Sequence, residues 1–456
     1  MLDIKLNNLG NIKEANIKLN KLTIFCGENN SGKTYLNYVL YELLDKRFTL
    51  RNDIFTSIVK DTKENGSIKL DINEFINNNF EKIRSSFEKH FEKSLDRFFS
   101  TTQGSFKDFK LNINQTIEET QLYCKDIRLN EELSIGKNNN TVCEITKEDD
   151  TNIIIIIKDI DLPDDMYIEF ISNLFFKFIF PYMFHDTFLL PAERTGLNLF
   201  YQELNINRNA LINHLQKSKI NPLDVIKDLI VSKYPQPIAD YIEFLNDTVN
   251  LKKKRSEFRE LNNILHNKII KGKYQVSSDG ISFLPYKTYF KGNEYQSKID
   301  LHMASSTVKT FFSLEFYLEH MAVKGAYLII DEPELNLHPD NQRKTARLIS
   351  QIVNAGVNVI ISTHSDYIIR ELNNLIMLKS DFNSKDKLMN QYNYKEDELL
   401  CKDDVYSYLL KDGEVKPMNI TENDGIIAKT FDDVINKLNS SSDDIYYTKM
   451  EDLEDE

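Results

Sequence analysis

Apolar residues follow two kinds of spacing along this chain of 456 residues. Residues 1–20 alternate apolar and polar positions, which is typical of half-buried strands. Three continuous apolar runs, at residues 21–25, 327–330 and 357–361, predict buried strands. Apolar residues spaced by three or four predict a helix after the first run, at residues 36–44, and another helix is expected between the second and third runs. Strands that alternate with helices predict an α/β fold.

The middle of the chain has a more polar, mainly helical pattern. Residues 48–134 repeat apolar positions at helical spacing, and residues 80–99 within them place aromatic residues among charged ones. Aromatic residues at this spacing are usually helix–helix contacts, not platforms for stacked bases. Residues 138–159 predict a β-hairpin with an acidic turn. Residues 202–272 return to a helical pattern interrupted by prolines, and no heptad repeat lasts long enough for a long coiled-coil arm.

Composition and charge change this picture in two respects. No apolar run approaches the roughly 18 residues that span a bilayer, and the N-terminus lacks the basic and apolar blocks of a signal peptide, so a cytoplasmic protein without a membrane partner is expected. The formal charge of −13 argues against a uniformly basic surface for nucleic acid. Positive charge is nevertheless concentrated at residues 251–259 and 268–273, where a solvated helix face and a contact with a phosphate backbone are both open interpretations.

Four cysteines are scattered along the chain: Cys26, Cys124, Cys143 and Cys401. None belongs to a C-x-x-C pair or lies near a cluster of histidines. The spacing therefore indicates neither a zinc site nor a disulfide framework, and all four are expected to be reduced thiols.

A glycine-rich segment separates the first buried strand from the helix that follows it. Its sequence, GENNSGKT at residues 27–34, matches the pattern G-x-x-x-x-G-K-[ST] of a phosphate-binding loop. In such a loop, backbone N–H groups surround the phosphates, the lysine reaches the β and γ oxygens, and the hydroxyl ligates Mg²⁺. A glycine-rich turn without a ligand is the alternative, which the position between a strand and a helix N-terminus disfavours. The residues expected to bind ATP here are Gly27, Asn29, Asn30, Ser31, Gly32, Lys33 and Thr34.

Two acids follow the second buried strand. Asp331 can hold Mg²⁺ through water, together with Thr34, and Glu332 can orient or deprotonate an attacking water. This pair favours hydrolysis of the nucleotide over binding alone, although two solvated acids at a strand end are the simpler alternative. In sequence, 297 residues separate Lys33 from Asp331, a gap that a compact core would not need.

Two further candidates follow from their positions. Ser305 and Ser306 precede the apolar helix at residues 308–318, where small hydroxyl residues normally serve as N-caps but where a phosphate can also dock. His364 ends the third buried strand, and a lone histidine is more often structural than catalytic. Its position at the same sheet edge as the acids predicts a sensor of the γ-phosphate.

The motifs GENNSGKT, ASSTVK, LIIDEPELNLHP and ISTHSDYII together resemble those of the ABC-type ATPase heads of the SMC, RecF and OLD-like superclass. They are most similar to prokaryotic OLD-like ATPases of anti-phage defence modules. The resemblance implies an α/β ABC-type P-loop ATPase head with a mixed sheet, interrupted by a mainly helical insertion, that uses ATP and Mg²⁺. The implied division is a head at residues 1–47, 170–201 and 274–456, an insertion with a β-hairpin at residues 48–169, and a helical segment at residues 202–273.

The resemblance also implies a homodimer or a higher homo-oligomer. In such an assembly each chain gives Ser305 and Ser306 to the γ-phosphate that its partner binds. The sequence departs from the family pattern at three residues: His338 stands where many relatives carry an aspartate, and Glu193 and Arg194 replace an obvious glutamine. The double glycine of transporters is also missing before the helix, so transport is disfavoured.

Two functions are consistent with these motifs. By resemblance, the chain is a sensor or regulatory scaffold for a separate effector, a nuclease or a toxin, in a bacterial anti-phage defence system. The alternative is a DNA-repair ATPase of the RecF or SMC kind that clamps DNA with its basic segments. Intrinsic nuclease activity is not expected, because the residues after His364 offer no convincing strand-borne glutamate and D-x-D pair for two metals.

Overall fold

The computed structural model describes residues 2–45, 53–135, 140–147, 149–201, 234–278, 280–290, 293–295, 297–427 and 429–454. Residues 202–233, which belong to the predicted helical segment, lie outside the described residues, as does position 148 in the predicted hairpin turn. Across the described ranges, no helix is both long enough and apolar enough to cross a membrane.

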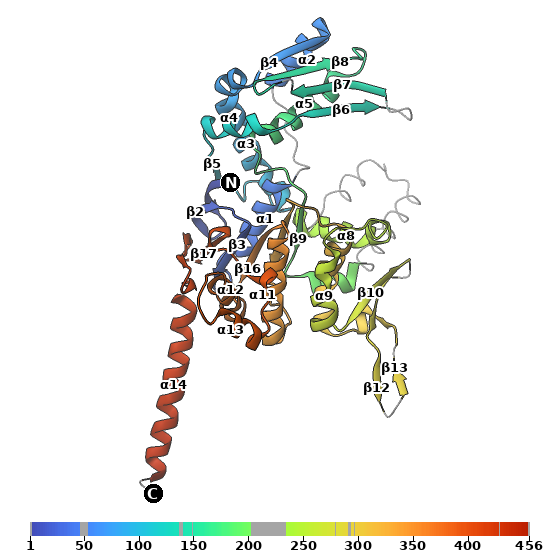
Figure 1. The fold of residues 1–456 in the computed structure, drawn as a ribbon. Helices are drawn as coiled ribbons and strands as arrows, with labels where there is room; N and C mark the ends of the chain where they lie inside the picture. Colours follow the sequence, from blue (N-terminus) through green and yellow to red (C-terminus); the bar gives the residue numbers. More distant parts are fainter. Residues whose placement is uncertain are drawn as a thin grey trace, which may run out of the picture.

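A nine-stranded mixed sheet forms the centre of the molecule (Figure 1). From one edge to the other its strands are β5 (Lys110–Ile113), β1 (Asp3–Leu9), β2 (Ile12–Lys18), β18 (Glu414–Pro417), β17 (Val405–Lys411), β3 (Leu22–Gly27), β16 (Asn358–Thr363), β15 (Tyr327–Asp331) and β9 (Thr187–Leu190). The strands from β17 to β9 are parallel, whereas β1 pairs antiparallel with β2 and β5. The predicted α/β fold with a mixed sheet is confirmed, and the carboxyl ends of β3, β15 and β16 meet at one edge.

The three predicted buried strands are present as β3, β15 and β16. Every residue of β3 and β15 is buried, and β16 is buried from its second residue onward. Continuous apolar runs are typical of such strands because a parallel sheet is covered on both faces. In the sheet register Asp331 lies beside Ser362, and Thr363 lies beside Cys26. The polar residues at these strand ends are therefore neighbours.

Helices cover both faces of this sheet. Those around it are α1 (Lys33–Leu44), α10 (Ser306–His320), α11 (Pro339–Asn354), α12 (Asp366–Met377) and α13 (Lys385–Tyr392). On one face Phe25 and Ile329 share an apolar cluster with Val39 of α1. On the other face Ile24 and Ile330 share a cluster with α10, α11 and α12. Alternate side chains of the same strands thus contribute to two cores, which hold the strand ends in place.

The chain between α1 and β9 forms the upper part of the molecule in Figure 1. Its elements are α2 (Asp53–Asn65), β4 (Ser67–Asp71), α3 (Ile72–Phe98), α4 (Ile117–Asp126), β6 (Asn130–Ile135), β7 (Asn140–Lys147), β8 (Asn152–Ile157) and α5 (Asp164–Ile179). β7 and β8 pair antiparallel where the sequence predicts a hairpin, but β4 and β6 extend them to four strands. Both added strands are largely exposed and lack a continuous apolar run, which is why the pattern did not reveal them. β5 comes from the same stretch and joins the central sheet.

The aromatic residues of α3 are helix contacts, as their spacing predicts. Phe80 and Phe87 are fully buried, with ring centroids 6.2 Å and 5.7 Å from that of Phe180. Phe87 also lies 6.2 Å from Phe176 of α5. This aromatic cluster packs α3 against α5 and continues into the core beneath α1.

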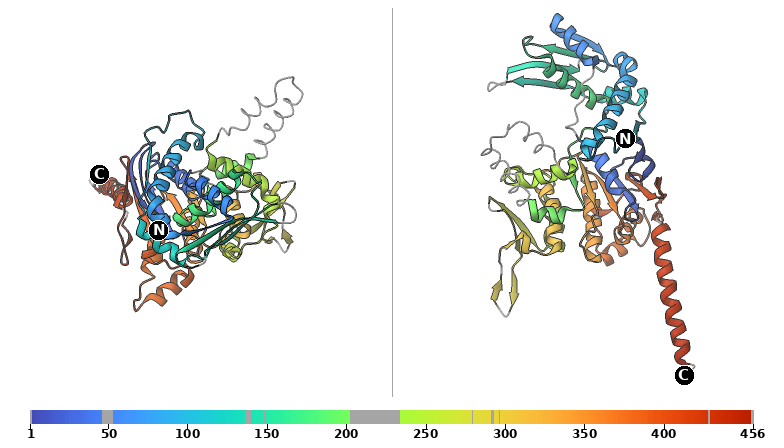
Figure 2. Two further views of the ribbon diagram at one scale, coloured as in Figure 1. Left: turned by 90° about the horizontal axis from the view of Figure 1, so that it is seen from above. Right: turned by 180° about the vertical axis from the view of Figure 1, so that it is seen from behind.

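The region before α10 and the C-terminal tail supply the remaining elements. They are α8 (Gln236–Leu251), α9 (Asn262–Ile264), a π-helical turn (Leu265–Ile269), β10 (Gly272–Ser277), β11 (Gly280–Pro285), β12 (Thr288–Phe290), β13 (Asn293–Tyr295), β14 (Ile299–Asp300), β19 (Ile420–Thr421), β20 (Gly425–Ile426), α14 (Lys429–Glu454) and short 3₁₀ helices at Arg259–Leu261, Leu301–Met303, Glu396–Glu398 and Lys402–Asp404. Figure 1 and the right-hand view of Figure 2 show α14 extending away from the body. The tail also adds β17 and β18 to the central sheet, which the sequence pattern did not predict.

Candidate nucleotide site

The loop at residues 27–32 turns from β3 directly into α1. Gly32 has a φ of 99°, and a Cβ atom there would lie 2.9 Å from Cγ1 of Ile12. Asn30 is also left-handed, with a φ of 64°. Both positions favour the residue types present, because left-handed backbone suits glycine and, less well, asparagine. The tight turn places the free N–H groups at the start of α1 next to the loop, an arrangement that attracts anions.

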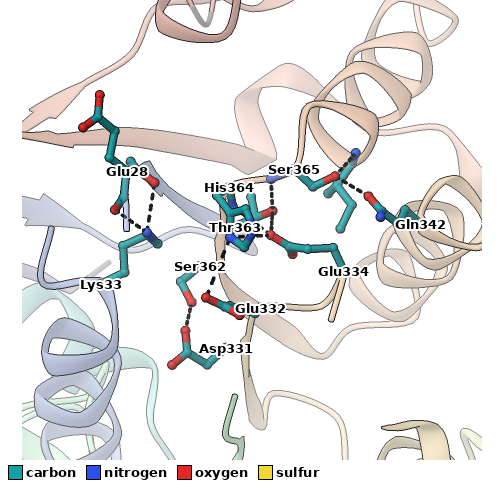
Figure 3. A network of polar contacts seen from close by, with 12 residues as sticks. Glu28, Lys33, Asp331, Glu332, Glu334, Gln342, Ser362, Thr363, His364 and Ser365 are labelled. Atoms are coloured by element: carbon teal, nitrogen blue, oxygen red, sulfur yellow. Dashed lines mark hydrogen bonds and ion pairs between the residues drawn. The ribbon is translucent and has the colours of Figure 1, made fainter. Parts of the chain in front are cut away.

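Lys33 is the buried cation of this loop. The residue is only 6% exposed. Its Nζ atom donates hydrogen bonds to the backbone oxygens of Gly27 (2.9 Å) and Glu28 (2.8 Å) (Figure 3). Burial lowers the pKa of Lys33, and the negative charges of Asp331 and Glu332 oppose that decrease. The loop thus holds an ammonium group within electrostatic reach of the two acids.

Asp331 lies at the centre of a buried polar cluster. Thr34 Oγ1 donates a hydrogen bond of 2.7 Å to Asp331 Oδ2. The other carboxylate oxygen, Oδ1, accepts from Ser362 Oγ and from Asn37 Nδ2, the latter at 3.3 Å. Asn37 Nδ2 also donates to Ser362 Oγ at 2.8 Å. Residues 297 positions apart therefore meet, and Asn37, which the sequence did not single out, holds the carboxylate from α1.

Glu332 and His364 face each other at the ends of β15 and β16 (Figure 3). Glu332 has a φ of 51°, and its backbone N–H donates to the Ser362 oxygen at 3.0 Å. Its side chain is 26% exposed, with Oε1 at 3.7 Å from His364 Nδ1. A left-handed glutamate is uncommon, and here the sheet hydrogen bond holds it. The result is a partly solvent-exposed carboxylate beside a histidine, and a carboxylate in such a position can act as a general base.

Glu334 is a functional-site neighbour that the sequence did not identify. Its carboxylate is buried, and Oε1 accepts hydrogen bonds of 2.8 Å from Thr363 Oγ1 and from the His364 backbone N–H. Burial raises the pKa of Glu334, and these two hydrogen bonds oppose the increase. The only sequence signal was a third acid in DEPE, one loop turn after the strand.

The role of Glu193 and Arg194 was left open by the sequence. Both follow β9, and Arg194 contacts the backbone of the two acids at the end of β15. Arg194 is 2% exposed, and its guanidinium donates to the backbone oxygens of Pro191 (3.0 Å), Asp331 (2.7 Å) and Glu332 (2.7 Å). A buried arginine with carbonyl partners fixes the backbone that carries both acids. Burial raises the pKa of Glu193, and the charges of Asp331 and Glu332 add to that increase.

Comparison with known proteins agrees with this site. A family model described as an AAA ATPase domain matches residues 1–369. The chain belongs to this AAA ATPase family. This match confirms the prediction that the chain is an ATPase in general.

The solved structures that match this chain include SMC heads. The Smc head domain with an extended coiled coil, bound to the C-terminal domain of ScpA and derived from Pyrococcus furiosus, has a TM-score of 0.31 and 10% identity over 96% of this chain and 98% of that chain. The SmcHead bound to the C-winged helix domain of ScpA has a TM-score of 0.32 and 10% identity over 92% of this chain and 97% of that chain. The SMC head domain from Thermotoga maritima has a TM-score of 0.30 and 8% identity over 92% of this chain and 99% of that chain. A search of curated protein sequences found no match.

In this AAA ATPase, Ser305 and Ser306 lie apart from the cluster around Asp331. Both are exposed, and Ser305 caps α10 by accepting a hydrogen bond of 3.3 Å from the Val308 N–H. Among the described residues, the hydrogen bonds of both serines stay within α10. His338 similarly caps α11, with Nδ1 accepting from Asp340 N at 3.3 Å. One chain thus brings together the loop, the acids and His364, but not the two serines.

The donor set at the sheet edge fits a nucleoside triphosphate with Mg²⁺. It contains an ammonium group on Lys33, a hydroxyl on Thr34 and a carboxylate on Asp331, next to a loop in which a Cβ atom at residue 32 would collide with the Ile12 side chain. Ser31 Oγ is buried without a hydrogen-bond partner in the described structure, which leaves a donor in the loop for a phosphate oxygen. Within the described ranges, no group of three or more His, Cys, Asp or Glu residues could hold a metal. Mg²⁺ in nucleotide sites usually needs only one or two protein carboxylates, since phosphates and water complete its shell.

Proposed function

We propose that this AAA ATPase hydrolyses ATP to ADP and phosphate with Mg²⁺ as cofactor. The observation that carries the proposal is the contact of Thr34 with Asp331 beside the buried ammonium of Lys33. Lys33 would hold the β- and γ-phosphates, and Thr34 and Asp331 would hold the metal. When bound, Mg²⁺ neutralises the charge that develops on the phosphate oxygens.

Glu332 and His364, the two partly exposed side chains of the site, would have different roles in the reaction. Glu332 would accept a proton from the attacking water, because its carboxylate is open to solvent and its backbone is fixed by Arg194. His364 would contact the γ-phosphate and stabilise its charge in the transition state. Glu332 Oε1 lies 3.7 Å from His364 Nδ1, so the two groups are neighbours at the same sheet edge.

Replacing Thr34 by alanine tests the metal site. Its hydroxyl is the smallest group that links α1 to Asp331, so its loss should raise the Mg²⁺ concentration for half-maximal ATPase activity by about ten- to a hundredfold. Phosphate release measured across a Mg²⁺ titration gives this value for both proteins. Thr56→Ala on α2 is a matched control and should titrate like the parent. A parent chain that releases no phosphate at any Mg²⁺ concentration would refute the proposed reaction.

We further propose that the ATPase is of the ABC type and acts as a cytoplasmic homodimer or higher homo-oligomer. The exposure of Ser305 and Ser306 at the N-terminus of α10, away from the same chain's phosphate loop, supports a site completed by a second chain. Closure around ATP would then transmit the nucleotide state to a separate effector, a nuclease or a toxin, in an anti-phage defence system. This last step rests on the resemblance of the motifs to OLD-like defence ATPases.

A second candidate function, clamping of DNA, is favoured by the basic loop after α8. Lys253, Lys254 and Arg255 are exposed, and no carboxylate forms an ion pair with them in the described part of the chain. Three free cations on one loop are suited to a phosphate backbone. The loop also contacts α10, because the Lys254 oxygen accepts a hydrogen bond of 2.7 Å from His320 Nδ1. DNA held here would thus lie near the C-terminal end of α10, the end opposite Ser305.

Reversing the charge of this loop distinguishes the two functions. If the protein clamps DNA, changing Lys253, Lys254 and Arg255 together to glutamate should weaken duplex binding by about tenfold to a thousandfold and flatten its salt dependence. Fluorescence anisotropy with a labelled duplex at several salt concentrations measures both effects. Changing the exposed α3 residues Lys82, Lys89 and Lys93 to glutamate is the control with the same net charge. A parent chain without salt-sensitive DNA binding would exclude the clamp and leave the effector scaffold.

A further inference from the structure

Glu334 links the loop after β15 to the end of β16. Its Oε1 atom accepts hydrogen bonds from Thr363 Oγ1 and from the His364 N–H, both at 2.8 Å, and lies 3.2 Å from His364 Nδ1. Residue 334 is only 6% exposed, whereas the His364 side chain is 45% exposed. One buried oxygen therefore holds the backbone N–H of His364 and also lies within ion-pair distance of its ring.

The geometry points to Glu334 as the positioning residue of His364, which it holds with the proton on Nδ1. An unprotonated Nδ1 would set its lone pair against a carboxylate oxygen 3.2 Å away, whereas an Nδ1–H would turn its positive end toward that oxygen, so the close approach favours an Nδ1–H. No hydrogen-bond partner of His364 Nε2 occurs among the described residues. Nε2 is then the ring nitrogen that can meet the γ-phosphate or the attacking water. The inference deepens the proposed ATP hydrolysis and rests on it.

Glu332 cannot take this positioning role as well. Its Oε1 lies farther from His364 Nδ1, at 3.7 Å, and its side chain is 26% exposed, against 6% for Glu334. A carboxylate in contact with water can exchange a proton with it, whereas a buried carboxylate with two hydrogen-bond donors on one oxygen is held in place. Two glutamates next to one histidine thus have different tasks because their surroundings differ.

The ring protonation of His364 tests the inference without any assay of hydrolysis. In protein labelled with ¹⁵N-histidine, long-range ¹H–¹⁵N spectra distinguish Nδ1-protonated from Nε2-protonated rings, and His364→Gln identifies the signals among the eight histidines. We expect His364 of the parent chain to carry its proton on Nδ1. Parent signals of a neutral ring with the proton on Nε2, or of rings exchanging between both forms, would overturn the proposal even if the protein hydrolyses ATP rapidly.

Variants of Glu334 separate positioning from mere structural support. Glu334→Leu removes the acceptor and should abolish the Nδ1-protonated signal, lower kcat about ten- to a hundredfold, and change the KM for ATP less than twofold. Glu334→Gln keeps an acceptor oxygen and should restore the signal and most of kcat. In the His364→Gln background, Glu334→Leu should cause little further loss of kcat, because the residue acts through the ring.

A matched control uses the other buried glutamate that faces a histidine. Glu315 belongs to α10 and lies outside the site, and its Oε1 atom is 2.8 Å from His266 Nε2. Glu315→Leu should leave the His364 signals unchanged. If Glu334→Leu is too unstable to purify, the parent spectrum and Glu334→Gln still decide the question. Loss of kcat in Glu334→Leu with an unchanged His364 tautomer would contradict the positioning role, and an Nδ1-protonated parent without ATPase activity would contradict only the proposed hydrolysis.

Discussion

Glu332→Gln should bind ATP as the parent does but hydrolyse it at least about a hundredfold more slowly. The amide keeps the size of the side chain and the backbone hydrogen bond to the Ser362 oxygen, so the φ of 51° at this residue should persist. An amide cannot accept the proton of the attacking water, and only the chemical step loses its base. Nucleotide binding by calorimetry and phosphate release under single-turnover conditions separate the two effects.

Glu332→Asp is the matched control for this change. It keeps the carboxylate but withdraws it by one methylene from His364, so its turnover should fall between those of the parent and the glutamine variant. A slow glutamine variant that also fails to bind ATP would indicate a distorted loop. Turnover at the parental rate in Glu332→Gln would remove Glu332 from the role of base.

The core of the fold could be predicted because its strands are buried on both faces. β3, β15 and β16 consist mainly of apolar residues, and the polar residues at their ends stand out against them. β17 and β18 gave no such signal. β17 mixes buried and half-buried residues, and it pairs with β3 across almost the whole length of the chain. Pairings over such separations are set by the packing of the complete sheet, which local periodicity does not contain.

Site residues could be predicted where they belong to a sequence motif. They could not be predicted where their role depends on a contact that only the fold creates. The loop pattern alone singles out Lys33 and Thr34. Arg194 was noticed as a departure from a family pattern, yet its bonds to the backbone oxygens of Asp331 and Glu332 depend on how β9 and β15 lie side by side. Glu334 depends in the same way on a loop that folds back onto the end of β16. Backbone carbonyls and N–H groups carry no sequence signature, so residues that bind them are found only in the structure.

The structure gives the shared site its sharpest test. Ser306→Arg places a bulky cation at the exposed N-terminus of α10, where a partner's γ-phosphate would dock, and Lys33→Ala removes the ammonium of the phosphate loop. Each variant alone should lose nearly all ATPase activity, because both sites of its dimer lack one half. The Ser306→Arg chain should still bind nucleotide as a monomer through Lys33. Its failure to dimerise with ATP, measured by light scattering, would show that only the shared half was lost.

Mixing the two variants should restore activity. A heterodimer combines the intact loop of the Ser306→Arg chain with the intact α10 of the Lys33→Ala chain, which makes one complete site and one doubly defective site. Random exchange makes half of the dimers mixed, so about one quarter of the parental activity should return. Ser442→Arg on α14 is the control, since the same added charge there should leave the ATPase active without a partner. If mixed dimers form and remain inactive, or if neither single variant loses activity, the site is not shared between chains, and α10 is simply a helix that Ser305 caps.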